Sequence, residues 1–192
     1  MSLRFAQWFC FAAIALGTAS CATAGSEARA RVETARSERQ PDLLIRKARA
    51  YASIGDATRA EDYLNAARES GGDERVIVRL LLDVCIADRR YRAAVGYAED
   101  FLRRHPRDRE LRFLLATLHV ALGNSNSALK ELRVVIAEAP QNVEARYVLA
   151  VVLRDEVGDL DAADLEFREY LRLAPKGAHA EEAHGSLLTR LP

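Results

Sequence analysis

The chain repeats the same pattern of small residues and helix breakers about every 34 residues. Pro106 and Pro140 lie 34 residues apart, Pro175 follows 35 residues later, and an alanine stands 12 residues before each proline. Self-similarity at this period is typical of stacked helix-turn-helix units, each of which buries an apolar face against its neighbours. The period therefore predicts an all-α solenoid, a fold that presents binding surfaces more often than catalytic sites.

Four units can be counted from Pro41, and the last one contains an extra residue. They span residues 41–74, 75–108, 109–142 and 143–177. Positions 8 and 20 should be small where helices cross; position 8 holds Ala48, Leu82, Ala116 and Ala150, and position 20 holds Ala60, Ala94, Ala128 and Ala163. Glycine near position 15 suits the left-handed residue that ends a helix, and proline at position 32 stops the second helix because it has no N–H to donate.

In these features the units resemble tetratricopeptide repeats over residues 41–177. The resemblance implies a right-handed α-solenoid of four helix pairs, and residues 178–192 look like half of a fifth unit, a helix that would cap the array. Local departures exist. Arg89 replaces glycine at position 15, and Arg112 and Arg146 stand at position 4, where the family prefers a large apolar residue. We expect Leu111 to turn inward in place of Arg112.

The N-terminal residues have the layout of a secretory signal. A short start with one positive charge, Arg4, is followed by about a dozen mostly apolar residues up to Leu16 and then by small residues. Such a run is shorter than the roughly 20 residues that a membrane-spanning helix needs. We therefore predict a signal peptide over residues 1–20, with an uncleaved anchor as the alternative.

The segment Thr18-Ala19-Ser20-Cys21 resembles a bacterial lipobox. That resemblance implies a lipid on Cys21 and, because no aspartate follows the cysteine, an outer-membrane lipoprotein that faces the periplasm. An Ala-x-Ala site at residues 22–24 offers ordinary signal peptidase cleavage instead, which would make the protein soluble in the periplasm or secreted. Residues 21–40 carry few apolar side chains and are expected to form a flexible tether.

In the tetratricopeptide family, ligands lie along the first helix of each unit. The corresponding positions indicate a partner-binding groove that comprises Ile45, Arg49, Val76, Arg79, Asp83, Glu110, Phe113, Thr117, Val120, Tyr147 and Val151. This path is apolar, has two aromatic side chains and has charged edges, so it suits an amphipathic helix or an extended apolar peptide. The alternative is that some of these residues pack between neighbouring units.

Other classes of function receive little support. The 28 basic and 28 acidic residues give a net charge of zero, so no basic field is present to attract nucleic acid. No nucleophile motif, phosphate loop or metal-ligand spacing occurs, and no cofactor or small-molecule substrate is expected. His119 falls at a core position, where we expect a packed, hydrogen-bonded side chain.

The resemblance to outer-membrane tetratricopeptide lipoproteins implies a non-enzymatic scaffold of the bacterial cell envelope. Such a scaffold would bind a protein or peptide partner in its concave groove, in pilus, secretion or envelope assembly. The alternative is a structural subunit of a larger envelope complex that uses its convex face, and an enzyme is the least favoured hypothesis.

Overall fold

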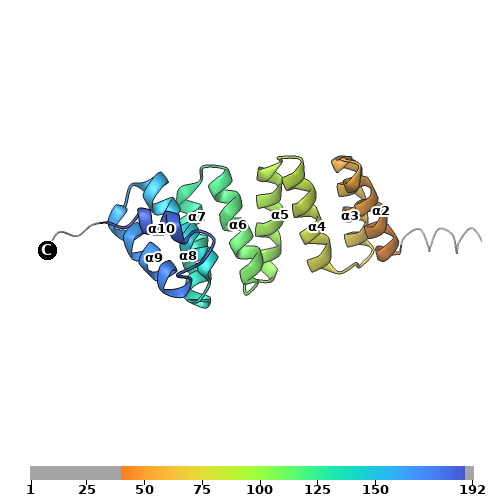
Figure 1. Ribbon diagram of the computed structural model, residues 1–192. Helices are drawn as coiled ribbons and strands as arrows, with labels where there is room; N and C mark the ends of the chain where they lie inside the picture. The colour runs from red at the N-terminus through yellow and green to blue at the C-terminus, as the bar shows by residue number, and fades with distance from the viewer. Residues whose placement is uncertain (1–39, 189–192) are drawn as a thin grey trace, which may run out of the picture.

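The computed structural model describes residues 40–188, and within this range the protein is entirely helical (Figure 1). The predicted signal peptide, Cys21, and the tether up to residue 39 lie outside the described residues, as do residues 189–192. The helices are α2 (Pro41–Ser53), α3 (Ala57–Glu69), α4 (Glu74–Ala87), α5 (Tyr91–Arg104), α6 (Arg109–Ala121), α7 (Ser125–Glu138), α8 (Val143–Val152), α9 (Leu160–Leu173) and α10 (Ala180–Gly185), with a π-helical turn, η1 (Leu153–Val157).

Successive helices pack in pairs, and the pairs follow one another in sequence order. The first helix of each pair packs on the second: α2 on α3, α4 on α5, α6 on α7 and α8 on α9. Figure 1 shows the pairs as one row that runs from α2 at one end to α9 and α10 at the other. The predicted all-α arrangement of stacked helix pairs is confirmed.

The recurring small and rigid residues account for this packing. Ala60, Ala94 and Ala128 are completely buried, so that the two helices of a pair can approach closely. Helices α5, α7 and α9 each end two residues before the proline of their unit. A helix cannot easily continue through the residue before proline, because the proline ring disfavours the α conformation there.

The start of nearly every unit has an aspartate or asparagine cap. Asp73, Asp108 and Asn142 precede α4, α6 and α8, and each side-chain oxygen accepts the N–H of the residue three positions later. Asp56 and Asp159 do the same for two of the second helices, α3 and α9. These caps satisfy donors that the first turn leaves unpaired, and they fix where each helix begins.

The extra residue of the fourth unit is accommodated at η1. There the helix widens into a π-helical turn over Leu153–Val157, which Gly158 ends with a φ of 76°. A single inserted residue that stays within a helix commonly produces such a turn. The turn includes Arg154, which reaches α10.

Arg112 and Arg146, the position 4 arginines, make matching contacts, each with a glutamate of its own unit and with a proline carbonyl of the unit before it. Arg112 donates to Glu131 on α7 at 2.6 Å and to the carbonyl of Pro106 at 2.7 Å. Arg146 repeats this arrangement with Glu166 and with the carbonyl of Pro140. Leu111 is buried, as expected, so the apolar position next to the arginine is filled from one residue away.

The C-terminal helix is shorter than the predicted cap. Helix α10 has six residues, of which Ala180 and Ala183 are buried, and it packs on α9. Beyond it, the backbone N–H of Leu188 donates to the buried carboxylate of Asp164 at 2.9 Å. The end of the solenoid is therefore held by backbone and polar contacts as well as by small apolar side chains.

Candidate functional site: a cleft between α4 and α6

Position 5 of the first helices lies where the first helices of neighbouring units meet. Ile45 on α2 is buried in a cluster that includes residues of α4, and Phe113 on α6 packs against the cluster that contains α8. Arg79 holds the same position on α4, and its charged side chain is exposed. In the core, α4 and α6 pack together through Val78 and Leu82 on one helix and Leu111 and Leu115 on the other. Between the second and third units, the surface at the level of position 5 is therefore left without an apolar side chain from α4.

A cleft of about 570 Å³ lies between α4 and α6 at this level. Five of the predicted groove residues line it: Arg79 and Asp83 from α4, and Glu110, Phe113 and Thr117 from α6. The remaining lining residues are Ile86, Arg109, Leu114, Ala139 and Asn142. Four of these, Arg109, Leu114, Ala139 and Asn142, lie outside the family's ligand positions and were not predicted.

Two charged groups in the cleft have no partner within the described residues. Arg79 and Asp83 lie four residues apart on α4, and both side chains are exposed. Neither takes part in a hydrogen bond or ion pair in the described part of the chain. Their charges are therefore free to meet charges on a bound molecule.

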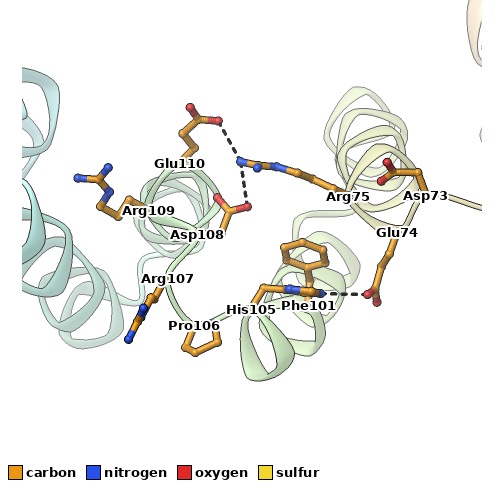
Figure 2. Close-up of a pocket in the computed structure, with 10 residues that line it drawn as sticks. All are labelled: Asp73, Glu74, Arg75, Phe101, His105, Pro106, Arg107, Asp108, Arg109 and Glu110. Atoms are coloured by element: carbon orange, nitrogen blue, oxygen red, sulfur yellow. Dashed lines mark hydrogen bonds and ion pairs between the residues drawn. The ribbon is translucent and has the colours of Figure 1, made fainter.

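An ion-pair cluster of Arg75, Asp108 and Glu110 lies at one edge of the cleft. The Arg75 guanidinium lies 3.2 Å from the Asp108 carboxylate and 3.6 Å from that of Glu110, so that it joins α4 to the start of α6. Figure 2 shows both carboxylates directed toward Arg75, beside a depression of about 720 Å³. Nearby, the His105 ring lies 3.1 Å from Glu74. Unlike Arg79 and Asp83, the charges of this edge are already engaged.

The other predicted groove residues do not form one continuous path with the cleft. Val76 is 37% exposed and lines a smaller depression of about 230 Å³ next to the cleft, whereas Arg49 is exposed on α2 outside both depressions. Val120 and Val151 are half-buried against the core. Ile45 is only 8% exposed, so it belongs to the core and does not present a binding surface.

Tyr147 is covered by the C-terminal helix and the turn before it. Its ring stacks on His179 with 3.8 Å between ring centroids, and its hydroxyl donates to Glu182 at 2.5 Å. Partial burial and this hydrogen bond raise the pKa of Tyr147 to about 12. The alternative role, packing between successive helices, is therefore the one that Tyr147 has in this structure.

Arg154 also holds the C-terminal helix in place. Its guanidinium donates to Glu182 at 3.0 Å and to the Ser186 hydroxyl at 2.6 Å. The hydrogen bonds from Tyr147 and Arg154 together hold the pKa of Glu182 below its ordinary value. These contacts depend on η1, because Arg154 lies within that turn.

Side chains suited to other chemistry do not gather in residues 40–188. No group of three histidine, cysteine, aspartate or glutamate residues in this range could hold a metal ion. His119 is buried as predicted, but its Nδ1 has no hydrogen-bond partner among the described residues, so the expectation of a hydrogen-bonded side chain is wrong for that atom. None of the described helices combines the length and apolar character that crossing a membrane requires.

Comparisons with known proteins agree with this architecture. Residues 86–151 match the family model described as tetratricopeptide repeat, and no curated protein matches the chain. A tetratricopeptide repeat protein from Parabacteroides merdae superposes with a TM-score of 0.68 at 21% identity, over 76% of this chain and 58% of that one. MamA from Desulfovibrio magneticus RS-1 superposes with a TM-score of 0.64 at 17% identity, over 76% of this chain and 84% of that one.

A third similar structure is YrrB, described as a tetratricopeptide repeat protein with an unusual peptide-binding site. It superposes with a TM-score of 0.62 at 22% identity, over 81% of this chain and 79% of that one. The described residues therefore have the fold of these tetratricopeptide repeat structures, and the sequence of residues 86–151 matches the family. At these identities, the similar structures establish the fold alone.

Proposed function

We propose that the chain is a non-enzymatic scaffold that binds a protein or peptide on its groove face, the face carried by α2, α4, α6 and α8. One observation carries this proposal: five residues that the sequence predicts from two different units line a single open cleft. They are Arg79, Asp83, Glu110, Phe113 and Thr117. The peptide-binding site described for YrrB supports a ligand of this kind.

The composition of the cleft suits a polypeptide better than a small metabolite. Apolar surface from Ile86, Phe113 and Leu114 lies beside exposed charges of both signs. An amphipathic helix or an extended segment presents the same combination, with apolar side chains on one face and charged ones at its edges. The cleft is also broad and open, as a site for a chain segment should be.

Crosslinking in cells followed by affinity purification tests the proposal. A variant with Arg79→Glu and Asp83→Arg, and separately Phe113→Ala, should lose the crosslinked partner. The matched control exchanges charges on the second helices, Lys130→Glu with Asp161→Lys, at two exposed residues without partners in the described chain. Partner capture that both groove variants retain, and the control loses, would contradict binding on the groove face.

The alternative is that the chain is a structural subunit that assembles through its opposite face. A specific observation favours this second candidate: a cleft of about 310 Å³ lies between α7 and α9, lined by Ile136, Leu153 and Leu165 among others. Leu165 is 60% exposed and lies with Ile136 and Leu153 in this cleft, and contiguous apolar surface of this kind can mark an interaction site. Loss of assembly in Leu165→Ser, with the groove variants unaffected, would favour this alternative.

We further propose that the scaffold acts in the bacterial cell envelope, in pilus, secretion or envelope assembly, anchored to the outer membrane by lipid on Cys21. The lipobox-like segment at residues 18–21 supports this location, and a soluble periplasmic or secreted form through cleavage at residues 22–24 is the alternative. Cys21→Ala should release the protein into the soluble fraction. A variant that stays bound to membranes would rule out the lipid anchor.

A further inference from the structure

We infer that the cleft between α4 and α6 selects a partner segment with one large apolar side chain flanked by an acidic and a basic residue. In the complex, the apolar side chain enters the cleft, the acidic residue meets Arg79, and the basic residue meets Asp83. This inference rests on the proposed function and deepens it, because it specifies the chemistry of the partner.

The preference for an apolar partner side chain follows from the packing at the other two contacts between neighbouring first helices. Ile45 and Phe113 supply apolar packing where α2 meets α4 and where α6 meets α8. Between α4 and α6 the residue at that position is Arg79, and the apolar surface of Ile86, Phe113 and Leu114 is left lining an open cleft. Val78 and Leu82 of α4 already pack with Leu111 and Leu115 of α6 in the core, so a partner side chain in the cleft would add burial only at the level of position 5.

The charged part follows from the order of groups along α4. Arg75, one turn before Arg79, is engaged by Asp108 and Glu110, and Arg109, which also lines the cleft, donates to the Glu138 carbonyl. Arg79 and Asp83 are one helical turn apart and have no partner in the described residues. They present a positive and then a negative charge, and a segment with the reverse arrangement would place like charges together.

Peptide display against the full-length protein tests this inference. Short random peptides are selected on the wild-type chain, and the enriched peptides are synthesised, each with a matched version in which its acid and base exchange places. We expect enriched sequences to carry a large apolar residue between an acid and a base, and exchange to weaken binding at least tenfold, the scale at which misplaced charges act.

The charge-reversed variant Arg79→Glu/Asp83→Arg provides a second test of the charge selection. It should prefer the exchanged peptides, and this reversal cannot arise from misfolding because it requires a gain of binding. Both side chains are exposed and unpaired within residues 40–188, so we expect helical content and melting temperature to match the wild type. Enriched peptides that bind wild type and the reversed variant equally would overturn the inference.

The outcomes separate this inference from the proposed function. Peptides that lose affinity with Phe113→Ala but ignore the charge reversal would leave the groove as the binding face and refute the charge selection. Peptides that ignore Phe113→Ala and the reversal, but lose affinity with Leu165→Ser, would refute both. Failure to enrich any common pattern would also count against both.

Discussion

Arg89 holds a backbone conformation that a side chain disfavours. Its φ is 56°, and it is the one non-glycine residue with positive φ in the described chain, whereas Gly55, Gly123 and Gly158 take up the corresponding conformation in the other units. A β-carbon in this region costs roughly 1 kcal/mol. The cost is tolerated because it lies in a turn whose geometry the two flanking helices impose.

Replacing Arg89 with glycine should therefore raise the free energy of unfolding by up to about 1 kcal/mol, since strain is relieved and no contact of Arg89 is lost. Arg92→Gly is the matched control, because Arg92 is exposed in the first turn of α5, where glycine relieves no strain and should lower the free energy of unfolding slightly. Urea denaturation followed by circular dichroism measures both. A lower stability for Arg89→Gly would show that the turn is not strained.

The sequence predicts residue roles well where the cause is local. Alanine at position 20 and proline at position 32 act through the sterics of their own backbone and immediate contacts, so their roles could be assigned from spacing alone. Arg112 and Arg146 stand at a position where the family prefers a large apolar residue, so the sequence alone indicates only a departure from the pattern. Their function depends on Glu131 and Glu166 in another helix and on carbonyls of the preceding unit, which no local pattern specifies.

At the scale of elements, each position 4 arginine should couple the two helices of its own unit through its glutamate partner. Arg112→Ala should lower the free energy of unfolding by about 1–3 kcal/mol, since it leaves the half-buried Glu131 carboxylate without its partner. Glu131→Ala should cost less when added to Arg112→Ala than on its own. A double-mutant cycle by denaturant titration measures this coupling, and simple additivity would contradict it.

The contact of α10 with α8 should weaken in acid. Tyr147 and Arg154 hold the pKa of Glu182 below its ordinary value of 4.5. A carboxyl with a lowered pKa in the folded state contributes stability that is complete above the unfolded value and is lost as the pH falls through the folded value. Hydrogen exchange of the α10 amides should therefore accelerate, beyond its intrinsic pH dependence, as the pH falls below about 4.5.

The substitution Glu182→Gln should remove this additional acceleration and reduce α10 protection near neutral pH. Asp155 also pairs with Arg154 and has a lowered pKa, so Asp155→Asn is the control and should retain the effect of Glu182. Acid loosening of equal size in Glu182→Gln would assign the effect to another group.

At the scale of the whole molecule, Arg79 at the junction between α4 and α6 should favour peptide binding and lower the free energy of unfolding. Arg79→Leu places an apolar side chain against Phe113 and should raise the free energy of unfolding by about 1 kcal/mol, while it reduces peptide binding. Arg46→Leu, at an exposed site on α2, is the control and should change neither quantity strongly. Calorimetry and peptide titration measure the two effects, and unchanged binding in Arg79→Leu would contradict this role.

The cleft at this junction is the part of the site that the sequence could not predict. The 34-residue period places Arg79, Asp83 and Phe113 on first helices, and the fold confirms those helices. Whether a cleft forms between two neighbouring first helices depends on side chains from both helices and on the second helix that supports them. Tyr147 shows the same limit, because its cover comes from α10, beyond the last complete unit.

Binding on the groove face is the central claim, and titration of the crosslinked partner, once identified, tests it most directly. The dissociation constant should rise at least tenfold, which corresponds to about 1.4 kcal/mol, for Arg79→Glu/Asp83→Arg. Leu165→Ser should leave it unchanged. An unchanged constant for the groove variant, together with a comparable loss for Leu165→Ser, would contradict binding on the groove face.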